Sequence, residues 1–340
     1  ANGRIYVGGL LCESEDNASY TNQPYLPNPE FTSPASPPSS PPQSVLNLSD
    51  GVYLAYLDAW QREITAIDDA LIREVALGGP DTTTRLQNAW QVKLLQVGTL
   101  SPPTVVTCDT DIPAFNELTT PTTGKLNART QPPKPEDNPC LLPPQTGYTR
   151  LENQLYRVEI HKGGPRNQIT FKWSRDNASV ETRITEISNK VLTVAGTGKD
   201  QILNFAGDQW VEIVDEESTL KGSTRALFRI DTVDANSNKI TLKTSASALA
   251  GLKGKKLRRW DQNDPNNANA DGVTATGDWI ELENGIQILF SDDEYHAGDY
   301  WLIPARTATG EIEWPPFEIP NSNPIPQPPR GIRHHFSRLA

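Results

Sequence analysis

The chain has 340 residues, a mass of 37.5 kDa, a formal net charge of −11 and a pI near 4.9. Nucleic acids and anionic membrane surfaces are bound through basic faces, so this acidic composition argues against both kinds of partner. No stretch approaches eighteen continuous apolar residues, and we therefore expect no membrane insertion. The length exceeds what one compact core usually holds, which predicts two or three packed units.

The 29 prolines are concentrated in three segments. Residues 24–42, 102–144 and 315–329 contain 25 of them, so the remainder of the chain is poor in proline. Strand patterns occupy the sequence between these segments, and we interpret the proline-rich segments as extended arms or linkers. The chain also lacks methionine and begins at Ala1, which predicts a processed or truncated product.

The first hundred residues have mostly strand patterns. Three segments rich in β-branched and aromatic residues predict strands: Gly3–Cys12, Val52–Thr65 and Trp90–Val97. Within Asp68–Leu77, apolar side chains recur at i, i+4 spacing and predict one short helix that Gly78 ends.

Strand patterns resume after the second proline-rich segment. Ile184–Val194 and Ile230–Leu242 each hold two alternating runs around a Ser-Asn-Lys turn. They predict either a weak repeat within a small barrel at about 180–250 or two unrelated hairpins with common turn residues. Further on, Asn284-Gly285 predicts a hairpin with a type I′ turn, in which Trp279 opposes Phe290.

These patterns define a fold class and a division of the chain. They predict a mainly β protein of several small antiparallel sandwich or barrel units, with proline-rich extended arms and one short helix. The predicted parts are a β unit at 1–101 with a proline-rich insertion at 24–42, an arm or linker at 102–147, β units at 148–314 and a C-terminal proline-rich arm at 315–340.

The three cysteines are Cys12, Cys108 and Cys140. Their wide spacing fits no zinc or redox motif. A bridge between Cys108 and Cys140 would close the long proline-rich segment and is the pairing we consider. The alternative is that all three are small apolar residues without special chemistry.

The densest group of candidate metal ligands is the run Asp292, Asp293 and Glu294 with His296. Clustered oxygen ligands suit calcium, so a structural calcium ion is one interpretation. The other is a solvated acidic turn, because the run lacks the ligand spacing and the glycine of a calcium loop. No nucleophile elbow, phosphate-binding loop or zinc-protease motif is present, and we assign no catalytic residue and no other cofactor.

Histidines and tryptophans complete the set of candidates. His161 ends a predicted strand, where a solvated or hydrogen-bonded side chain is expected. His334 and His335 are adjacent, so on a strand they point to opposite sides and cannot easily bind one ion. Four tryptophans could stack on sugar rings or pack in cores, and Trp173 shares its predicted core face with Phe171. These four are Trp60, Trp90, Trp173 and Trp260.

Seven segments together resemble an uncharacterised bacterial domain family that is often encoded beside phage-tail-like or contractile-injection-system genes. They are Gly3–Leu11 (GRIYVGGLL), Ile72–Asp81 (IREVALGGPD), Arg150–His161 (RLENQLYRVEIH), Thr170–Asn177 (TFKWSRDN), Leu257–Gln262 (LRRWDQ), Gly298–Gly310 (GDYWLIPARTATG) and Gly331–His335 (GIRHH). The resemblance implies a particle-associated or extracellular bacterial protein. It transfers no catalytic residue. Members of the family have further residues before the first strand, which agrees with the absent methionine.

Three functions are compatible with these observations. The first is a structural protein that forms homo-oligomers or joins a phage-tail-like particle through sheet edges and extended arms. The second is an extracellular β protein that binds or cleaves carbohydrate, with a surface glycan as its partner. The third is an adhesin domain stabilised by calcium at Asp292–Glu294.

Overall fold

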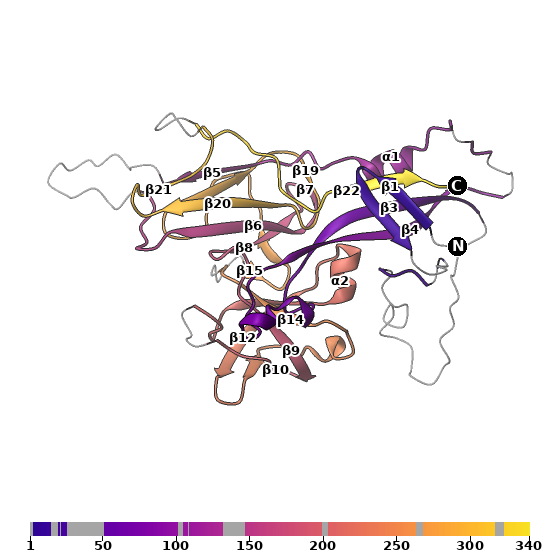
Figure 1. The fold of residues 1–340 in the computed structure, drawn as a ribbon. Coiled ribbons are helices and arrows are strands. Elements are labelled where there is room, and N and C mark those ends of the chain that lie inside the picture. The colour runs from indigo at the N-terminus through magenta and orange to yellow at the C-terminus, as the bar shows by residue number, and fades with distance from the viewer. Residues whose placement is uncertain are drawn as a thin grey trace. The chain divides into compact units, whose positions relative to one another are not determined.

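The computed structural model describes residues 3–14, 20, 22–25, 51–100, 105–107, 109–131, 147–198, 203–262, 268–316 and 323–340. These residues form mainly antiparallel strands with few, short helices (Figure 1). This confirms the predicted mainly β fold of several small antiparallel units. Contacts divide the chain into two compact units, Ala1–Pro121 with Ile332–Ala340, and Thr122–Gly331. No helix in the described ranges is long and apolar enough to cross a membrane.

The first unit is built around one long hairpin. Strands β3 (Val52–Ile64) and β4 (Arg85–Gly98) pair along their whole length (Figure 1). The C-terminal strand β22 (His334–Arg338) pairs with the other side of β3. Successive side chains of a strand point to opposite faces, so this sheet has two faces to cover.

Different segments cover the two faces of the hairpin. The hairpin of β1 (Gly3–Val7) and β2 (Leu10–Ser14) contributes apolar side chains to one face. On the other face, helix α1 (Pro113–Thr119) places Phe115 against Tyr56. The first core consists of Val7, Cys12, Leu57, Ala59 and Trp90, and the second of Leu54, Tyr56, Ile112 and Phe115.

The helix predicted at Asp68–Leu77 is wrong. These residues contain two short 3-10 turns, η2 (Ala70–Ile72) and η3 (Val75–Leu77). The carboxylates of Asp69 and Glu74 each cap the start of one turn by accepting a hydrogen bond from a backbone N–H, and the extended backbone of Arg73 separates the two turns. No residue of either turn is buried, so packing does not stabilise a longer helix.

A closed six-stranded barrel lies in the second unit. Its strands are β9 (Glu181–Ser188), β10 (Val191–Val194), β11 (Trp210–Val214), β12 (Leu227–Asp234), β13 (Lys239–Leu242) and β14 (Lys256–Trp260), in the spatial order β10-β13-β12-β11-β14-β9. The two hairpins with Ser-Asn-Lys turns are β9–β10 and β12–β13, which pair with each other through β10 and β13. Asn189 and Asn238 both have positive φ, as such tight turns require. Helix α2 (Glu216–Lys221) follows β11 and begins with a capping box at Asp215.

The remaining strands of the second unit form three sheets. A six-stranded sheet has the order β15-β16-β8-β6-β20-β21, a three-stranded sheet the order β17-β18-β5, and β19 pairs with β7. Their bounds are β5 (Leu126–Thr130), β6 (Gln154–Lys162), β7 (Gly164–Pro165), β8 (Thr170–Ser174), β15 (Ala268–Asn269), β16 (Gly272–Thr274), β17 (Ile280–Glu281), β18 (Ile286–Phe290), β19 (Glu294–Tyr295), β20 (Tyr300–Arg306) and β21 (Glu311–Ile312). One apolar core joins these sheets and includes both Phe171 and Trp173, which confirms the predicted core face.

The Asn284-Gly285 turn forms, but the register predicted around it is wrong. Both residues have positive φ, and Ile286 N donates to Glu283 O at 2.9 Å. Ile286 O then accepts from Leu282 N rather than from Glu283, so Glu283 is an extra residue on its strand. Ile280 therefore opposes Ile288, instead of Trp279 opposing Phe290. The extra residue acts as a bulge, which turns the Glu283 side chain toward a neighbouring strand.

Candidate functional site

The four candidate metal ligands lie around β19. Asp292 is exposed and forms an ion pair with Arg166 at 3.1 Å. The backbone of Glu294 pairs with β7, and its carbonyl accepts from Thr122 Oγ1 at 2.8 Å. In the described part of the chain, no three His, Cys, Asp or Glu side chains gather closely enough to hold a metal ion. The structure thus does not bring Asp292, Asp293, Glu294 and His296 together as one site.

The four candidate sugar-stacking tryptophans are buried. Their exposed fractions do not exceed 7%. A sugar ring stacks on an exposed aromatic face. None of the four offers such a face, so they belong to cores.

Of the three cysteines, the structure describes only Cys12. Cys108 and Cys140 lie outside the described residues, while Cys12 is buried with a free thiol.

The adjacent histidines point to different sides of β22, as predicted. The ring of His334 forms a hydrogen bond with Asp58, and the ring of His335 lies beside Gly8.

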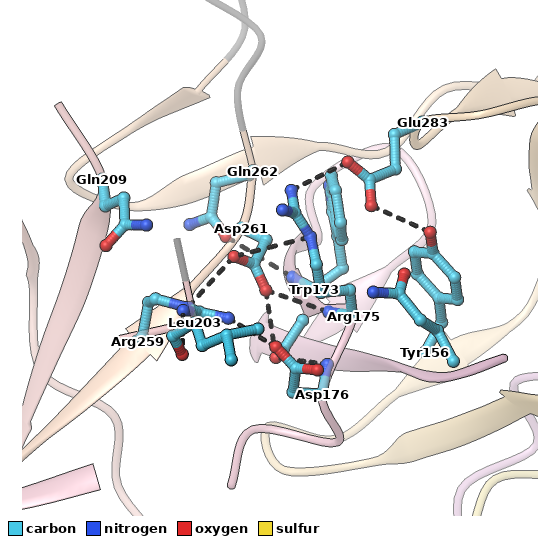
Figure 2. Close-up of polar contacts among 12 residues, drawn as sticks. Tyr156, Trp173, Arg175, Asp176, Leu203, Gln209, Arg259, Asp261, Gln262 and Glu283 are labelled. Carbon is cyan, nitrogen blue, oxygen red and sulfur yellow. Dashed lines mark hydrogen bonds and ion pairs between the residues drawn. The ribbon is translucent and has the colours of Figure 1, made fainter. Parts of the chain in front are cut away.

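Two of the segments that carry the family resemblance, Thr170–Asn177 and Leu257–Gln262, meet in the second unit (Figure 2). Asp261 follows β14, and its N–H donates to Trp173 O on β8 at 2.8 Å. The Asp261 carboxylate accepts from Arg175 N at 3.0 Å and from Ser174 Oγ at 3.2 Å. These bonds join the end of β8 to the end of β14, and they join the sheet to the barrel.

Two arginines complete this polar cluster. Arg175 Nη2 donates to Glu283 Oε2 at 2.8 Å, and the other Glu283 oxygen accepts from Tyr156 Oη at 2.8 Å (Figure 2). Arg259 Nε lies 3.2 Å from Asp261 Oδ1, and the same guanidinium pairs with Asp176. Arg259 also donates to the carbonyls of Leu203 and Asn204.

The cluster holds two guanidinium groups and three carboxylates, which are those of Asp176, Asp261 and Glu283. Each guanidinium faces two carboxylates, and burial, which outweighs the charge of Arg259, raises the pKa of Asp176. The Nε2 of buried Gln262 has no hydrogen-bond partner, whereas the hydroxyls of Ser174 and Tyr156 both donate to carboxylates of the cluster. The arrangement therefore fixes two turns against each other and has the chemistry of a structural clamp.

A second buried cluster centres on Lys172 of β8. Its ammonium lies 3.2 Å from Glu159 of β6 and 2.6 Å from Glu212 of β11. Trp260 on β14 donates its indole N–H to the same Glu212 oxygen at 2.9 Å. Burial alone would raise the pKa of Glu159, but the charges of Arg157 and Lys172 outweigh it and lower that pKa to about 2. The ionised form of Glu159 is thus favoured, in agreement with its ion pairs to Arg157 and Lys172.

An exposed apolar surface marks the end of the β3–β4 hairpin. Leu71, Val75, Leu77 and Leu86 are between 70% and 90% exposed. We call these four residues the hairpin tip. Exposed large aliphatic side chains at one end of a hairpin are a candidate surface for another molecule to cover.

Sequence reasoning assigned these residues to other roles. The spacing of Leu71 and Val75 predicts a short helix, whereas both side chains are exposed on short 3-10 turns. The alternation along β8 puts Lys172 opposite the face of Phe171 and Trp173, but nothing in the local pattern indicates that the barrel covers that face as well. The only available signal for the polar clusters was that their segments carry the family resemblance.

Comparison with known proteins agrees with that resemblance at the level of the family. No curated protein and no solved structure is detectably similar to the chain. The sequence matches a family described as Family of unknown function (DUF6519) over residues 1–103 and 104–339. Because these matches cover nearly the whole sequence, the chain belongs to this family of unknown function.

Proposed function

We propose that this chain is a structural protein that assembles with further copies of itself through the hairpin tip. The observation that carries the proposal is the exposure of Leu71, Val75 and Leu77 at the end of a two-stranded arm. Burying such side chains in a neighbouring copy would be favourable by about 1.5–3 kcal/mol for each fully covered residue.

The ordered backbone of the hairpin tip favours a specific contact over nonspecific association. Asp69 and Glu74 fix the backbone of η2 and η3 by accepting hydrogen bonds from Leu71 N and Ala76 N. A pre-ordered loop loses less conformational entropy on binding than a disordered one. The tip is therefore suited to insertion into a complementary apolar surface.

The wider setting that we propose is a phage-tail-like or other extracellular particle. This part rests on the resemblance to proteins encoded beside such gene clusters. In a particle that repeats one chain many times, every copy would present the same hairpin tip to the same surface of the next copy. Within this proposal, the partners are copies of the chain and other particle components, with no nucleic acid and no membrane insertion.

Sedimentation analysis tests the proposal. The wild-type chain is expected to form a concentration-dependent oligomer, whereas a Leu71→Glu/Leu77→Glu variant should remain monomeric at the same concentrations. Both side chains are exposed, so the variant should keep its fold, which circular dichroism checks. Leu151→Glu is the matched control, because Leu151 is 96% exposed elsewhere in the chain. A wild-type chain that is monomeric at every concentration, or a double variant that assembles normally, contradicts the proposal.

A further inference from the structure

The six-stranded sheet has a charged face that the barrel covers. On β6 and β8, Val158, Ile160 and Phe171 point into the apolar core of the sheets. Glu159 and Lys172 alternate with them and point to the opposite face. There they meet Glu212 and Trp260, which belong to barrel strands β11 and β14.

Lys172 is the centre of this junction. Only 1% of its side chain is exposed, and it holds one carboxylate of the sheet and one of the barrel together. Its ammonium also lies 4.6 Å from the centre of the Trp260 ring. The junction therefore depends on one buried cation that is matched to two buried anions.

His161 lies at the same junction and has no role in the clamp described above. Its exposed fraction is 1%, and its Nδ1 has no hydrogen-bond partner. The pairing of β6 with β8 is irregular between Ile160 and Lys162, which makes His161 an extra residue on its strand. Its carbonyl accepts from Thr224 Oγ1, in the segment between α2 and β12, at 2.8 Å.

The charged groups that face His161 come from four places. They are Lys172 on β8, Glu212 on β11, Glu159 on β6 and Asp271 in the turn between β15 and β16. The three carboxylates are already matched by three cations: Arg157 and Lys172 pair with Glu159, Lys172 pairs with Glu212, and Lys162 pairs with Asp271 at 2.7 Å. A proton on His161 would thus add a cation without an unused anion to balance it.

We propose that His161 is an acid-sensitive switch, whose protonation loosens the junction between the six-stranded sheet and the barrel. The proton comes from solvent when the junction opens. In the closed junction, an imidazolium would have a buried Nδ1–H without an acceptor, next to the Lys172 ammonium. Both features favour the open form once the ring is charged.

The sign of the pH dependence follows from linkage. Burial, and then the charge of Lys172, lowers the pKa of His161 from 6.5 to about 4. An open junction restores the ordinary value, so between these limits the open form binds more protons. Opening is therefore favoured as the pH falls from 6.5 toward 4, by at most a factor of about ten per pH unit for this single group.

Hydrogen exchange at one backbone amide measures the opening of the junction directly. The N–H of Asp261 donates to Trp173 O, a bond between barrel and sheet. In the wild-type chain, we expect its protection factor to fall at least about tenfold between pH 6.5 and 4.5. In His161→Gln, whose side chain does not titrate, the change should stay below about twofold. His296→Gln is the control, since His296 is exposed in the same unit. Equal pH dependence in wild type and His161→Gln overturns the proposal.

A second measurement needs no substitution. With labelled histidine, the imidazole resonances of the full chain are followed by NMR from pH 7.5 to 3. We expect the His161 ring to titrate near pH 4, after Asp261 protection has fallen between pH 6.5 and 4.5. A His161 ring that titrates near pH 6.5, or protection that persists through its titration, also overturns the proposal.

Discussion

Nδ1 of His334 lies 2.7 Å from Oδ1 of Asp58, and this contact fastens the C-terminal strand β22 to the centre of the first unit. Asp58 is buried on β3, and its second oxygen accepts from Lys93 Nζ at 2.7 Å. The ring of Trp60 stacks on His334 with 5.1 Å between centroids. One carboxylate thus joins three strands of the same sheet, β22, β3 and β4.

Replacement of Asp58 should weaken the first unit. In Asp58→Asn the negative charge that holds His334 and Lys93 is lost, while the shape of the side chain is kept. We expect the free energy of unfolding in urea at pH 7 to fall by about 2–3 kcal/mol, the size of a charge-assisted hydrogen bond. Asp81→Asn is the control, because Asp81 is exposed. Equal stability of the two variants would mean that the contact contributes nothing.

The same carboxylate predicts an acid response. Burial opposes the charged form of Asp58, but the hydrogen bond and charge of His334, followed by Lys93, hold its pKa below the ordinary 3.8. A carboxylate of this kind stabilises the folded state above its unfolded pKa and loses that effect as the pH falls through the folded value. Below pH 4, the unfolding free energy of the wild type should therefore fall more steeply than that of Asp58→Asn. Urea titrations from pH 5 to 2.5 measure both slopes, and parallel slopes contradict the prediction.

Local patterns in the sequence were sufficient to predict most strands, the Asn-Gly turn and the Ser-Asn-Lys turns. Alternating runs predicted the strands around Val52–Thr65 and Trp90–Val97, and Asn284-Gly285 predicted a turn that forms. These features depend on neighbouring residues alone. The helix at Asp68–Leu77 failed because its apolar face meets no partner, and a helix of that length is unstable without one.

Long-range pairings were outside the reach of such patterns. Nothing near His334 indicates that Asp58, 276 residues earlier, accepts its hydrogen bond. The buried Lys172 illustrates the same limit, because a charged residue on an alternating strand normally marks a solvent face. Its burial becomes apparent only when the barrel is seen to cover that face.

A double-mutant cycle can test the close approach of the turn between β1 and β2 to strand β22. A Cβ added at Gly8 would lie 2.0 Å from His335 Nδ1, and Gly8 also has a φ of +56°. Gly9 has a positive φ as well, but nothing lies within 4 Å of its added Cβ. Gly8→Ala should therefore cost more unfolding free energy than Gly9→Ala, whose cost is about 1 kcal/mol from backbone strain. His335→Ala should relieve the excess in Gly8→Ala but not the cost in Gly9→Ala. If the effects of Gly8→Ala and His335→Ala on the unfolding free energy are additive, the His335 ring moves aside without a cost in stability.

Removal of the buried ammonium should destabilise the second unit. In Lys172→Met, Glu212 stays buried and keeps only the indole N–H of Trp260 as a partner. We expect a loss of about 3–5 kcal/mol, as when one member of a buried ion pair is deleted. Lys172→Met/Glu212→Gln should recover part of this loss, since a neutral amide oxygen can still accept from Trp260. Thermal unfolding followed by near-ultraviolet circular dichroism compares the variants. A double variant less stable than Lys172→Met contradicts the argument.

Gln23 protects the edge of the first unit's sheet. Among the described strands of this sheet, β4 lies at an edge, and the Gln23 amide bonds both backbone groups of Val92 there. Nε2 donates to Val92 O at 3.0 Å, and Val92 N donates to Oε1 at 2.6 Å, so one side chain occupies the place of a neighbouring peptide group.

Unpaired edge groups promote association with other strands. Gln23→Ala should therefore show faster exchange of the Val92 amide and more light scattering at high concentration. Gln61→Ala is the matched control, because Gln61 is exposed and its amide donates to the Asn88 side chain and to no backbone group of the sheet edge. To separate this association from assembly through the hairpin tip, both substitutions are repeated in the Leu71→Glu/Leu77→Glu background, where scattering should still rise for Gln23→Ala alone.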